Sequence, residues 1–103
     1  MYSILVIGGG SIGKRHLRNL LALGEKDIVV VETNPERAKE IEKEFAVPTV
    51  PNIGLAFAAQ SFSIAFICSP SRFHIEQAIG CAEHGCDLFI EKPFVNISNI
   101  LSF

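Results

Sequence analysis

The 103-residue sequence has no basic excess and no long apolar run. Nine Lys and Arg stand against eleven Asp and Glu, for a net charge of −2, so a nucleic-acid partner is disfavoured because phosphate backbones are bound by clustered positive charge. Unbroken apolar runs stop at five residues, in 55–59 and 64–68, far short of the roughly 18 that indicate a membrane span. Neither nucleic acid nor membrane is therefore expected as a partner.

Cysteine is also scarce. The three cysteines are odd in number and form no Cys-x-x-Cys pair, so the sequence predicts neither a disulfide framework nor a metal site. The first residues carry no basic segment ahead of an apolar stretch, as a secretory signal would, and a cytoplasmic location is expected. The apolar share of 49% and charged share of 19% argue against disorder and favour one compact domain.

Short apolar runs alternate with helical patterns along the chain. Strands are predicted at 4–7, 28–31, 47–50, 63–68 and 88–90, with helices between them. Pro48 and Pro51 restrict the third strand to an edge of the sheet. This alternation predicts an α/β fold, a Rossmann-type doubly wound parallel sheet of about five strands.

Two helices show apolar stripes that predict which face packs on the sheet. In the first helix the stripe is Ile12, His16, Leu20 and Leu23. In the helix after the fourth strand it is Ile75, Ala78, Ile79 and Ala82. We expect these residues to face the core, since apolar side chains three and four apart lie on one side of a helix.

The domain boundary is predicted near Pro93. Residues 1–93 account for the predicted Rossmann-type domain, and 94–103 form a tail too short for the further helix and strand of a six-stranded sheet. We therefore expect a truncated domain, with any substrate domain absent.

A glycine pattern follows the first predicted strand and opens the first helix. In this pattern Gly8 permits a tight turn, Gly10 lets the backbone approach a diphosphate, and Gly13 lets the helix pack closely on the strand. The amides of Ser11 and Ile12 would then point at the phosphates from the positive end of the helix dipole. A glycine-rich turn without a ligand is the alternative.

An acidic residue, Glu32, ends the next strand, 19 residues after Gly13. A carboxylate there accepts hydrogen bonds from ribose hydroxyls and repels a 2′-phosphate, which favours NAD over NADP. Arg37, about one helical turn further on, leaves NADP open because it could receive that phosphate. S-adenosylmethionine is a third candidate for the same loop.

A carboxylate, an ammonium and a proline follow the last predicted strand as Glu91-Lys92-Pro93. In an open α/β sheet ligands bind at the carboxyl ends of the strands, so a lysine there could move a substrate proton. The alternative is an ion pair that merely ends the strand.

These segments together resemble the glucose–fructose oxidoreductase / inositol dehydrogenase / MocA family of NAD(P)-dependent oxidoreductases. The matching residues are 8–16, 32–38, 68–74 and 91–93, in the order of that family. The resemblance implies that Ser69, Pro70 and His74 line the cofactor groove, and that Glu91 and Lys92 face the nicotinamide, with Lys92 of catalytic type. His74 could equally brace the turn that precedes it.

Two functions are consistent with this pattern. The first is the NAD(P)-binding domain of an oxidoreductase that transfers a hydride between a nicotinamide cofactor and a sugar, polyol or related hydroxy compound. Alone, such a domain would bind cofactor without turnover, because hydride transfer needs substrate held against the cofactor. The second is a non-enzymatic nucleotide-binding module that forms homo-oligomers through the edge strand 88–90.

Overall fold

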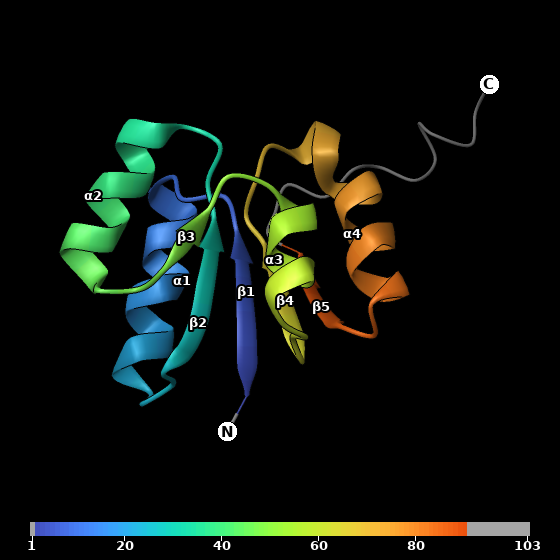
Figure 1. The fold of residues 1–103 in the computed structure, drawn as a ribbon, viewed down its shortest axis with the longest axis horizontal. Coiled ribbons are helices and arrows are strands. Elements are labelled where there is room, and N and C mark those ends of the chain that lie inside the picture. Colours follow the sequence, from blue (N-terminus) through green and yellow to red (C-terminus); the bar gives the residue numbers. More distant parts are fainter. Residues whose placement is uncertain (1, 91–103) are drawn as a thin grey trace.

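The computed structural model describes residues 2–90, which form one parallel sheet with helices on both faces (Figure 1). Its elements in chain order are β1 (Ser3–Ile7), α1 (Ser11–Ala22), β2 (Asp27–Val31), α2 (Pro35–Phe45), β3 (Thr49–Val50), α3 (Ile53–Ala59), β4 (Ile64–Ile67), the 3₁₀ turn η1 (Ser71–Phe73), α4 (His74–Glu83) and β5 (Asp87–Ile90). The strand order is β3-β2-β1-β4-β5, with all four pairings parallel. The predicted Rossmann-type sheet of five strands is confirmed, as is the edge position of β3.

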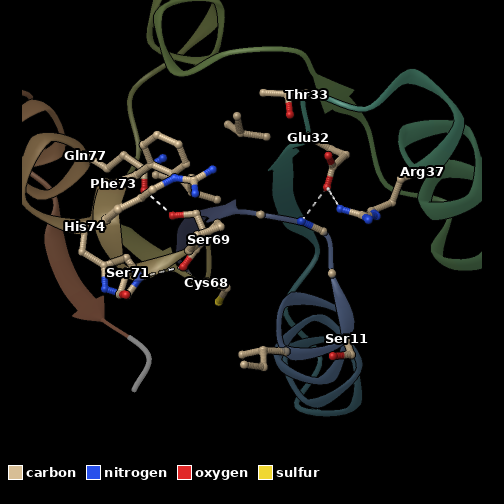
Figure 2. Close-up of a pocket in the computed structure, with 18 residues that line it drawn as sticks. Ser11, Glu32, Thr33, Arg37, Cys68, Ser69, Ser71, Phe73, His74 and Gln77 are labelled. Carbon is tan, nitrogen blue, oxygen red and sulfur yellow. Dashed lines mark hydrogen bonds and ion pairs between the residues drawn. The ribbon is translucent and has the colours of Figure 1, made fainter. Parts of the chain in front are cut away.

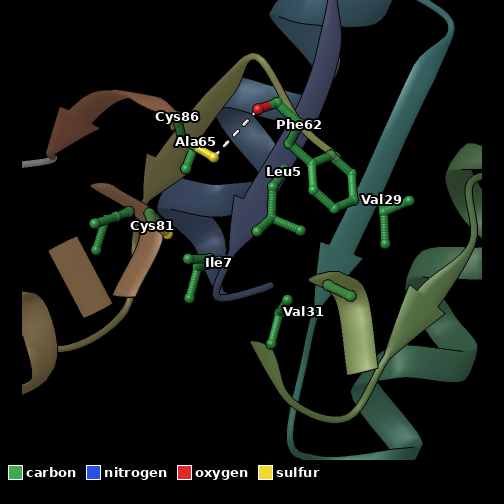
Figure 3. Close-up of a cluster of buried hydrophobic side chains, with 10 residues drawn as sticks. Leu5, Ile7, Val29, Val31, Phe62, Ala65, Cys81 and Cys86 are labelled. Atoms are coloured by element: carbon green, nitrogen blue, oxygen red, sulfur yellow. Dashed lines mark hydrogen bonds between the residues drawn. The ribbon is translucent and has the colours of Figure 1, made fainter. Parts of the chain in front are cut away.

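Two apolar clusters hold the layers together, one on each face of the sheet. Ile4 and Val6 of β1 pack with Leu17 and Leu20 of α1 and Ile41 of α2. On the opposite face the alternate residues of β1 pack under α3 and α4 (Figure 3); that cluster comprises Leu5, Ile7, Val29, Val31, Ala56, Phe62, Ala65, Ile67, Cys81 and Cys86. Because β1 is buried on both faces, its run of β-branched and leucine side chains carries no polar alternation.

The core-facing side of α1 differs from the predicted stripe. Gly13, Leu17 and Leu20 are the buried residues, whereas Ile12 is 36% exposed and Leu23, past the end of the helix, is 80% exposed. The helix is rotated because Gly13 packs directly on the backbone of Gly8, and residues four and seven positions after Gly13 then face the sheet.

The core-facing side of α4 also differs. His74 and Cys81 are buried, while the predicted core residues Ile75 and Ile79 are 42% and 54% exposed. The His74 ring is hydrogen-bonded to the Ser69 carbonyl, which sets the rotation of the helix from its first turn. Cys81 then faces the same side of the helix as His74, and Ala78, the residue that this face shares with the predicted stripe, packs against the core.

The sequence Asn34-Pro35, an N-cap residue followed by proline, predicts that a helix begins here, and α2 does begin at Pro35. The Asn34 side chain accepts hydrogen bonds from the amides of Glu36 and Arg37, at 3.0 and 3.2 Å, with Pro35 in the first turn. This cap fixes where α2 begins and therefore where Arg37 projects. Among residues 2–90, no helix is both long and apolar enough to cross a membrane.

Candidate functional site

A cavity of about 730 Å³ opens at the carboxyl ends of β1, β2 and β4, where the strand order reverses. Open α/β sheets bind their ligands at this point, because the loops on either side diverge there. Residues 8–12 form its floor, Glu32, Thr33 and Arg37 line one wall, and residues 68–74 with Gln77 line the other (Figure 2). The structure thus brings the predicted glycine loop, acid and Ser-Pro turn around a single space.

Gly8 turns the chain from β1 into the floor of this cavity. Its φ is +99°, and a Cβ there would lie 2.9 Å from the amide nitrogen of Ser69 and 3.0 Å from the carbonyl carbon of Cys68. Its own amide donates to the carbonyl of Val31, at 2.9 Å. Glycine is required here by both conformation and contact, as the sequence pattern indicates.

Gly13 and Gly10 are glycines for different reasons. A Cβ on Gly13 would lie 1.9 Å from the Gly8 carbonyl oxygen, so only glycine lets α1 approach the loop this closely. A Cβ on Gly10 would meet no atom within 4 Å, and its backbone is ordinary extended chain with φ −72° and ψ −168°. Nothing in the described part of the protein demands glycine at position 10, and Gly10 is one of the residues that line the cavity.

The amino terminus of α1 faces this open space. Within the described chain no side chain caps it, and its first turn carries no acidic residue. The Ser11 and Ile12 residues line the cavity at the positive end of the helix dipole. The site therefore offers backbone amides to an anion, as helix amino termini in nucleotide-binding folds do.

Glu32 is the buried charge of the site, with only 6% of its surface exposed. Its Oε1 accepts from the amide of Gly9 and its Oε2 from the amide of Asn34, each at 2.9 Å, and Arg37 Nη1 lies 3.5 Å from Oε1. A buried carboxylate is costly unless it is paired and hydrogen-bonded, so these three donors hold it in place. Figure 2 shows the contact of Glu32 with Arg37.

Gly9 is a site residue that the glycine pattern did not single out. Its amide holds Glu32, and a Cβ there would lie 2.2 Å from Cδ1 of Ile41 and 2.9 Å from Glu32 Oε1. Only an extra glycine next to Gly8 and Gly10 could have signalled this role, because the contact partners are distant in the sequence. Thr33, Arg72, Phe73 and Gln77 also line the cavity without having been predicted.

The opposite wall is braced by His74, which is 3% exposed. Its Nε2–H donates to the carbonyl of Ser69, at 2.6 Å, and the Ser69 hydroxyl contacts the side-chain oxygen of Gln77. With Nε2 as donor, Nδ1 is the acceptor of the neutral ring, and it is buried without a hydrogen-bond partner among the described residues. The brace of the turn is thus observed, while direct contact of His74 with a cofactor stays a prediction.

The described lining of the cavity does not include Lys14, Arg15 or Arg18, the cations of α1. Lys14 Nζ lies 3.9 Å from carboxylate oxygens of Glu40 and Glu44 on α2, and Arg18 lies 3.2 Å from Glu44. His16 packs against the rings of Phe66 and Phe89, with centroids 5.5 and 5.3 Å away.

Two of the three thiols lie in the apolar core, outside the cavity lining. Burial raises the pKa of Cys81 to about 11, with nearby Cys86 contributing, and burial also raises the pKa of Cys86. Cys68, at the end of β4, is partly buried and lines the cavity. Across residues 2–90, no group of three or more metal-ligating side chains is placed to hold a metal ion.

Glu91 and Lys92 lie outside the described residues, together with Pro93 and the tail 94–103. The strand that precedes them does end at the cavity edge of the sheet, because Ile90 pairs in register with Ile67. The roles of Glu91 and Lys92 stay predictions.

A five-stranded parallel sheet with a glycine loop at its switch point defines a Rossmann nucleotide-binding domain. The chain belongs to the Gfo/Idh/MocA family, described as an oxidoreductase family with an NAD-binding Rossmann fold, whose model matches residues 2–100. The resemblance of the sequence motifs to this family is therefore confirmed, and the cofactor of the family is NAD.

The relatives include dehydrogenases of different substrates. 4-Carboxy-2-hydroxymuconate-6-semialdehyde dehydrogenase of Sphingobium sp. is 27% identical over 95 residues, which are 90% of this chain and 30% of that protein. Others are inositol dehydrogenases. Myo-inositol dehydrogenase Hyg17 of Streptomyces leeuwenhoekii is 30% identical over 91 residues, which are 88% of this chain and 28% of that protein. The structure of myo-inositol 2-dehydrogenase from Lactobacillus plantarum superposes with a TM-score of 0.82 at 26% identity, over 94% of this chain and 30% of that one. The structure of scyllo-inositol dehydrogenase from Lactobacillus casei with bound NAD(H) and scyllo-inositol superposes with a TM-score of 0.80 at 26% identity, over 99% of this chain and 31% of that one. The chain thus spans about 30% of the length of these relatives.

Proposed function

We propose that this chain binds NAD in the switch-point cavity and is the cofactor domain of a dehydrogenase acting on a polyol, a sugar or a related hydroxy compound. The observation that carries the proposal is the open space over Gly10 in front of uncapped helix amides. NAD supplies the hydride acceptor of such a reaction. The polyol class is suggested by the inositol dehydrogenases among the relatives.

Each part of the cavity has a role in this proposal. The amides of Ser11 and Ile12 hold the diphosphate, which approaches over Gly10. The Glu32 carboxylate accepts hydrogen bonds from the amides of Gly9 and Asn34, and its remaining lone pairs accept hydrogen bonds from the ribose hydroxyls. Its negative charge disfavours a 2′-phosphate. Arg37 lies against that carboxylate, which partly neutralises the charge of the guanidinium. Arg37 is therefore a weaker phosphate ligand than an arginine without such a partner.

The other wall would hold the second half of the cofactor. Ser69 and Pro70 line the cavity on the far side of the glycine loop from Glu32, and His74 keeps this turn in place. Lys92, next after Glu91 beyond β5, is proposed to orient a substrate hydroxyl and take part in its proton transfer. Since the chain spans about 30% of its relatives, we expect these 103 residues to bind cofactor without turnover.

Calorimetric titration of the 103-residue chain tests the proposal. We expect NAD to bind more tightly than NADP. We expect S-adenosylmethionine to show no heat of binding. Glu32→Gln should reduce the preference for NAD, whereas the matched Glu83→Gln, on an exposed residue at the end of α4, should not. A wild-type chain that binds neither dinucleotide contradicts the proposal.

A second candidate function, a dimerising module, is favoured by the outer strand. Within residues 2–90, β5 pairs only with β4, and its Leu88 and Phe89 are 39% and 46% exposed. An edge strand with exposed apolar side chains can pair with another chain. Light scattering at increasing concentration decides, because a monomer throughout the range contradicts association through this edge.

A further inference from the structure

The outer side of α4 and the neighbouring strand β5 form one apolar strip, which consists of Ile75, Ile79, Ala82 and Leu88. On the helix, Ile75 and Ile79 are 42% and 54% exposed, and Ala82 is exposed on the same side. This side faces away from α3, because His84, which ends α4 on the opposite side, stacks on Phe57 of α3 with ring centroids 4.0 Å apart. In Figure 1, α4 is the outermost helix on its face of the sheet.

Leu88 continues the strip onto the sheet. It pairs in register with Ala65, which belongs to the core cluster under α3 and α4, so the Leu88 side chain lies on the face that α4 covers. It is 39% exposed. Among residues 2–90, β5 pairs only with β4, so its outer edge offers backbone donors and acceptors directly beside the strip.

A partner for this surface must offer an edge strand and, on the same face, an apolar helix. A second copy of the chain offers both when a twofold axis perpendicular to the sheet brings the two β5 strands together antiparallel, because that axis keeps both α4 helices on one face. A twofold axis along the strands would pair them in parallel and place the two helices on opposite faces. Only the antiparallel arrangement brings the two strips together.

The spacing of this arrangement fits helix packing. Because α4 contacts both β4 and β5, its axis lies about half a strand spacing inside β5, and the twofold axis lies about half a spacing outside it. With neighbouring strands about 4.8 Å apart, the two α4 axes are about 9.6 Å apart, within the roughly 8–10 Å at which packed helices lie. The helices therefore touch when the strands pair.

The charges beside the strip are complementary in the same arrangement. Arg72, in the turn before α4, and Glu83, the last residue of α4, are both exposed. Their separation along a helix is roughly 16 Å, too far for contact within one chain. In an antiparallel pair the start of each α4 lies beside the end of the other, so each Arg72 faces the Glu83 of the second copy.

We infer that a second copy of this chain covers the α4 strip, with the two β5 strands antiparallel at the edge and the two α4 helices packed side by side. The inference rests on the dimerising function proposed above for the β5 edge, and it adds the helix surface that such a dimer buries. Burial of apolar side chains from both copies drives the association, and the two Arg72–Glu83 pairs fix its orientation.

Light scattering and sedimentation of the full 103-residue chain over a concentration series measure the dissociation constant of the dimer. Ile79→Glu is expected to raise this constant by roughly tenfold or more, because a carboxylate would be buried between the two helices. The matched control is Leu55→Glu, since Leu55 is 50% exposed on α3, on the other side of α4 from the strip. It is expected to leave the constant unchanged.

A charge exchange tests the antiparallel orientation. Arg72→Glu and Glu83→Arg each place like charges opposite one another, and each is expected to weaken the dimer several-fold. The double variant again places opposite charges together and is expected to return the dissociation constant to that of the wild type. Because the two positions are too far apart to meet in one chain, such a recovery reports contact between copies.

Four results overturn the inference. A dimer that Ile79→Glu leaves intact excludes the α4 strip from the interface, while association through the β5 edge stands. A double variant no tighter than the single variants refutes the antiparallel packing. Species larger than a dimer contradict a closed twofold arrangement. A chain that stays monomeric throughout removes the dimerising function and the covered strip together. Calorimetric titration of the same samples with NAD tests the cofactor proposal independently, and circular dichroism with thermal unfolding excludes misfolding of each variant.

Discussion

Alanine at Gly13 should lower the stability of the protein, whereas alanine at Gly10 should lower its affinity for NAD, although both glycines belong to one glycine pattern. At Gly13 the new Cβ would lie 1.9 Å from the Gly8 carbonyl oxygen, against an ordinary contact of 3.4 Å or more. Since the obstacle is backbone, α1 and the loop must separate. Overpacking of this kind costs about 1–3 kcal/mol, and the higher helix propensity of alanine offsets about 1 kcal/mol of it. Because a backbone oxygen cannot rotate away, the overpacking cost lies at the upper end of that range, and we expect Gly13→Ala to be destabilised by about 2 kcal/mol.

At Gly10 the new Cβ would meet no protein atom within 4 Å, and φ of −72° suits alanine. The smaller entropy of the unfolded chain stabilises the variant by about 0.4–1 kcal/mol, and alanine is a poorer N-cap than glycine by a similar amount. The free energy of unfolding should therefore stay within about 0.5 kcal/mol of the wild type. The methyl group would occupy the space proposed for the diphosphate, so affinity for NAD should fall at least tenfold.

Urea unfolding and calorimetric titration with NAD, run on both variants and the wild type, check this pair. Gly10→Ala should unfold at the same urea concentration as the wild type and bind NAD at least tenfold more weakly. Gly13→Ala should unfold at a lower urea concentration than the wild type. Full NAD affinity in Gly10→Ala would refute the assignment of that space to a ligand. An unchanged unfolding midpoint in Gly13→Ala would show that the close approach of α1 to Gly8 is not what that glycine provides.

Three other predictions follow from the described contacts. Glu32→Gln should shift the ratio of NAD to NADP affinity toward NADP by roughly tenfold, because the charge that opposes a 2′-phosphate is removed; an unchanged ratio in titration counts against this role. His74→Leu should lower the free energy of unfolding by about 1–3 kcal/mol in urea, since the part-buried Ser69 carbonyl loses its donor, and His74→Gln should recover part of it. The pKa of Cys81 is raised from 9.0 to about 11, so the unfolded chain releases this proton first and stability should fall between about pH 9 and pH 11, by up to ~3 kcal/mol. Cys81→Ala should flatten that fall relative to the wild type, and parallel pH profiles of the two proteins would disprove the link.

Local patterns in the sequence were enough to predict the strands, their parallel arrangement and the cap of α2. Gly13 was predicted because its contact, the Gly8 carbonyl, lies a few residues away along the same loop and helix, and Gly8 was predicted because the local turn requires its positive φ. Glu32 was predicted from its place at the end of a strand. In each case the physical cause lies within one strand–turn–helix unit, where sequence spacing translates directly into geometry.

Contacts between units were decided only by the tertiary structure. The rotation of α4 depends on the bond between His74 and Ser69, and it leaves the predicted core residues Ile75 and Ile79 exposed. Gly9 received its role from Glu32, which is 23 residues away in sequence. Phe73 is half-open to the cavity only because the turn after β4 places it opposite β2. Periodicity identifies which residues share a face, but the packing of separate segments determines which face is covered.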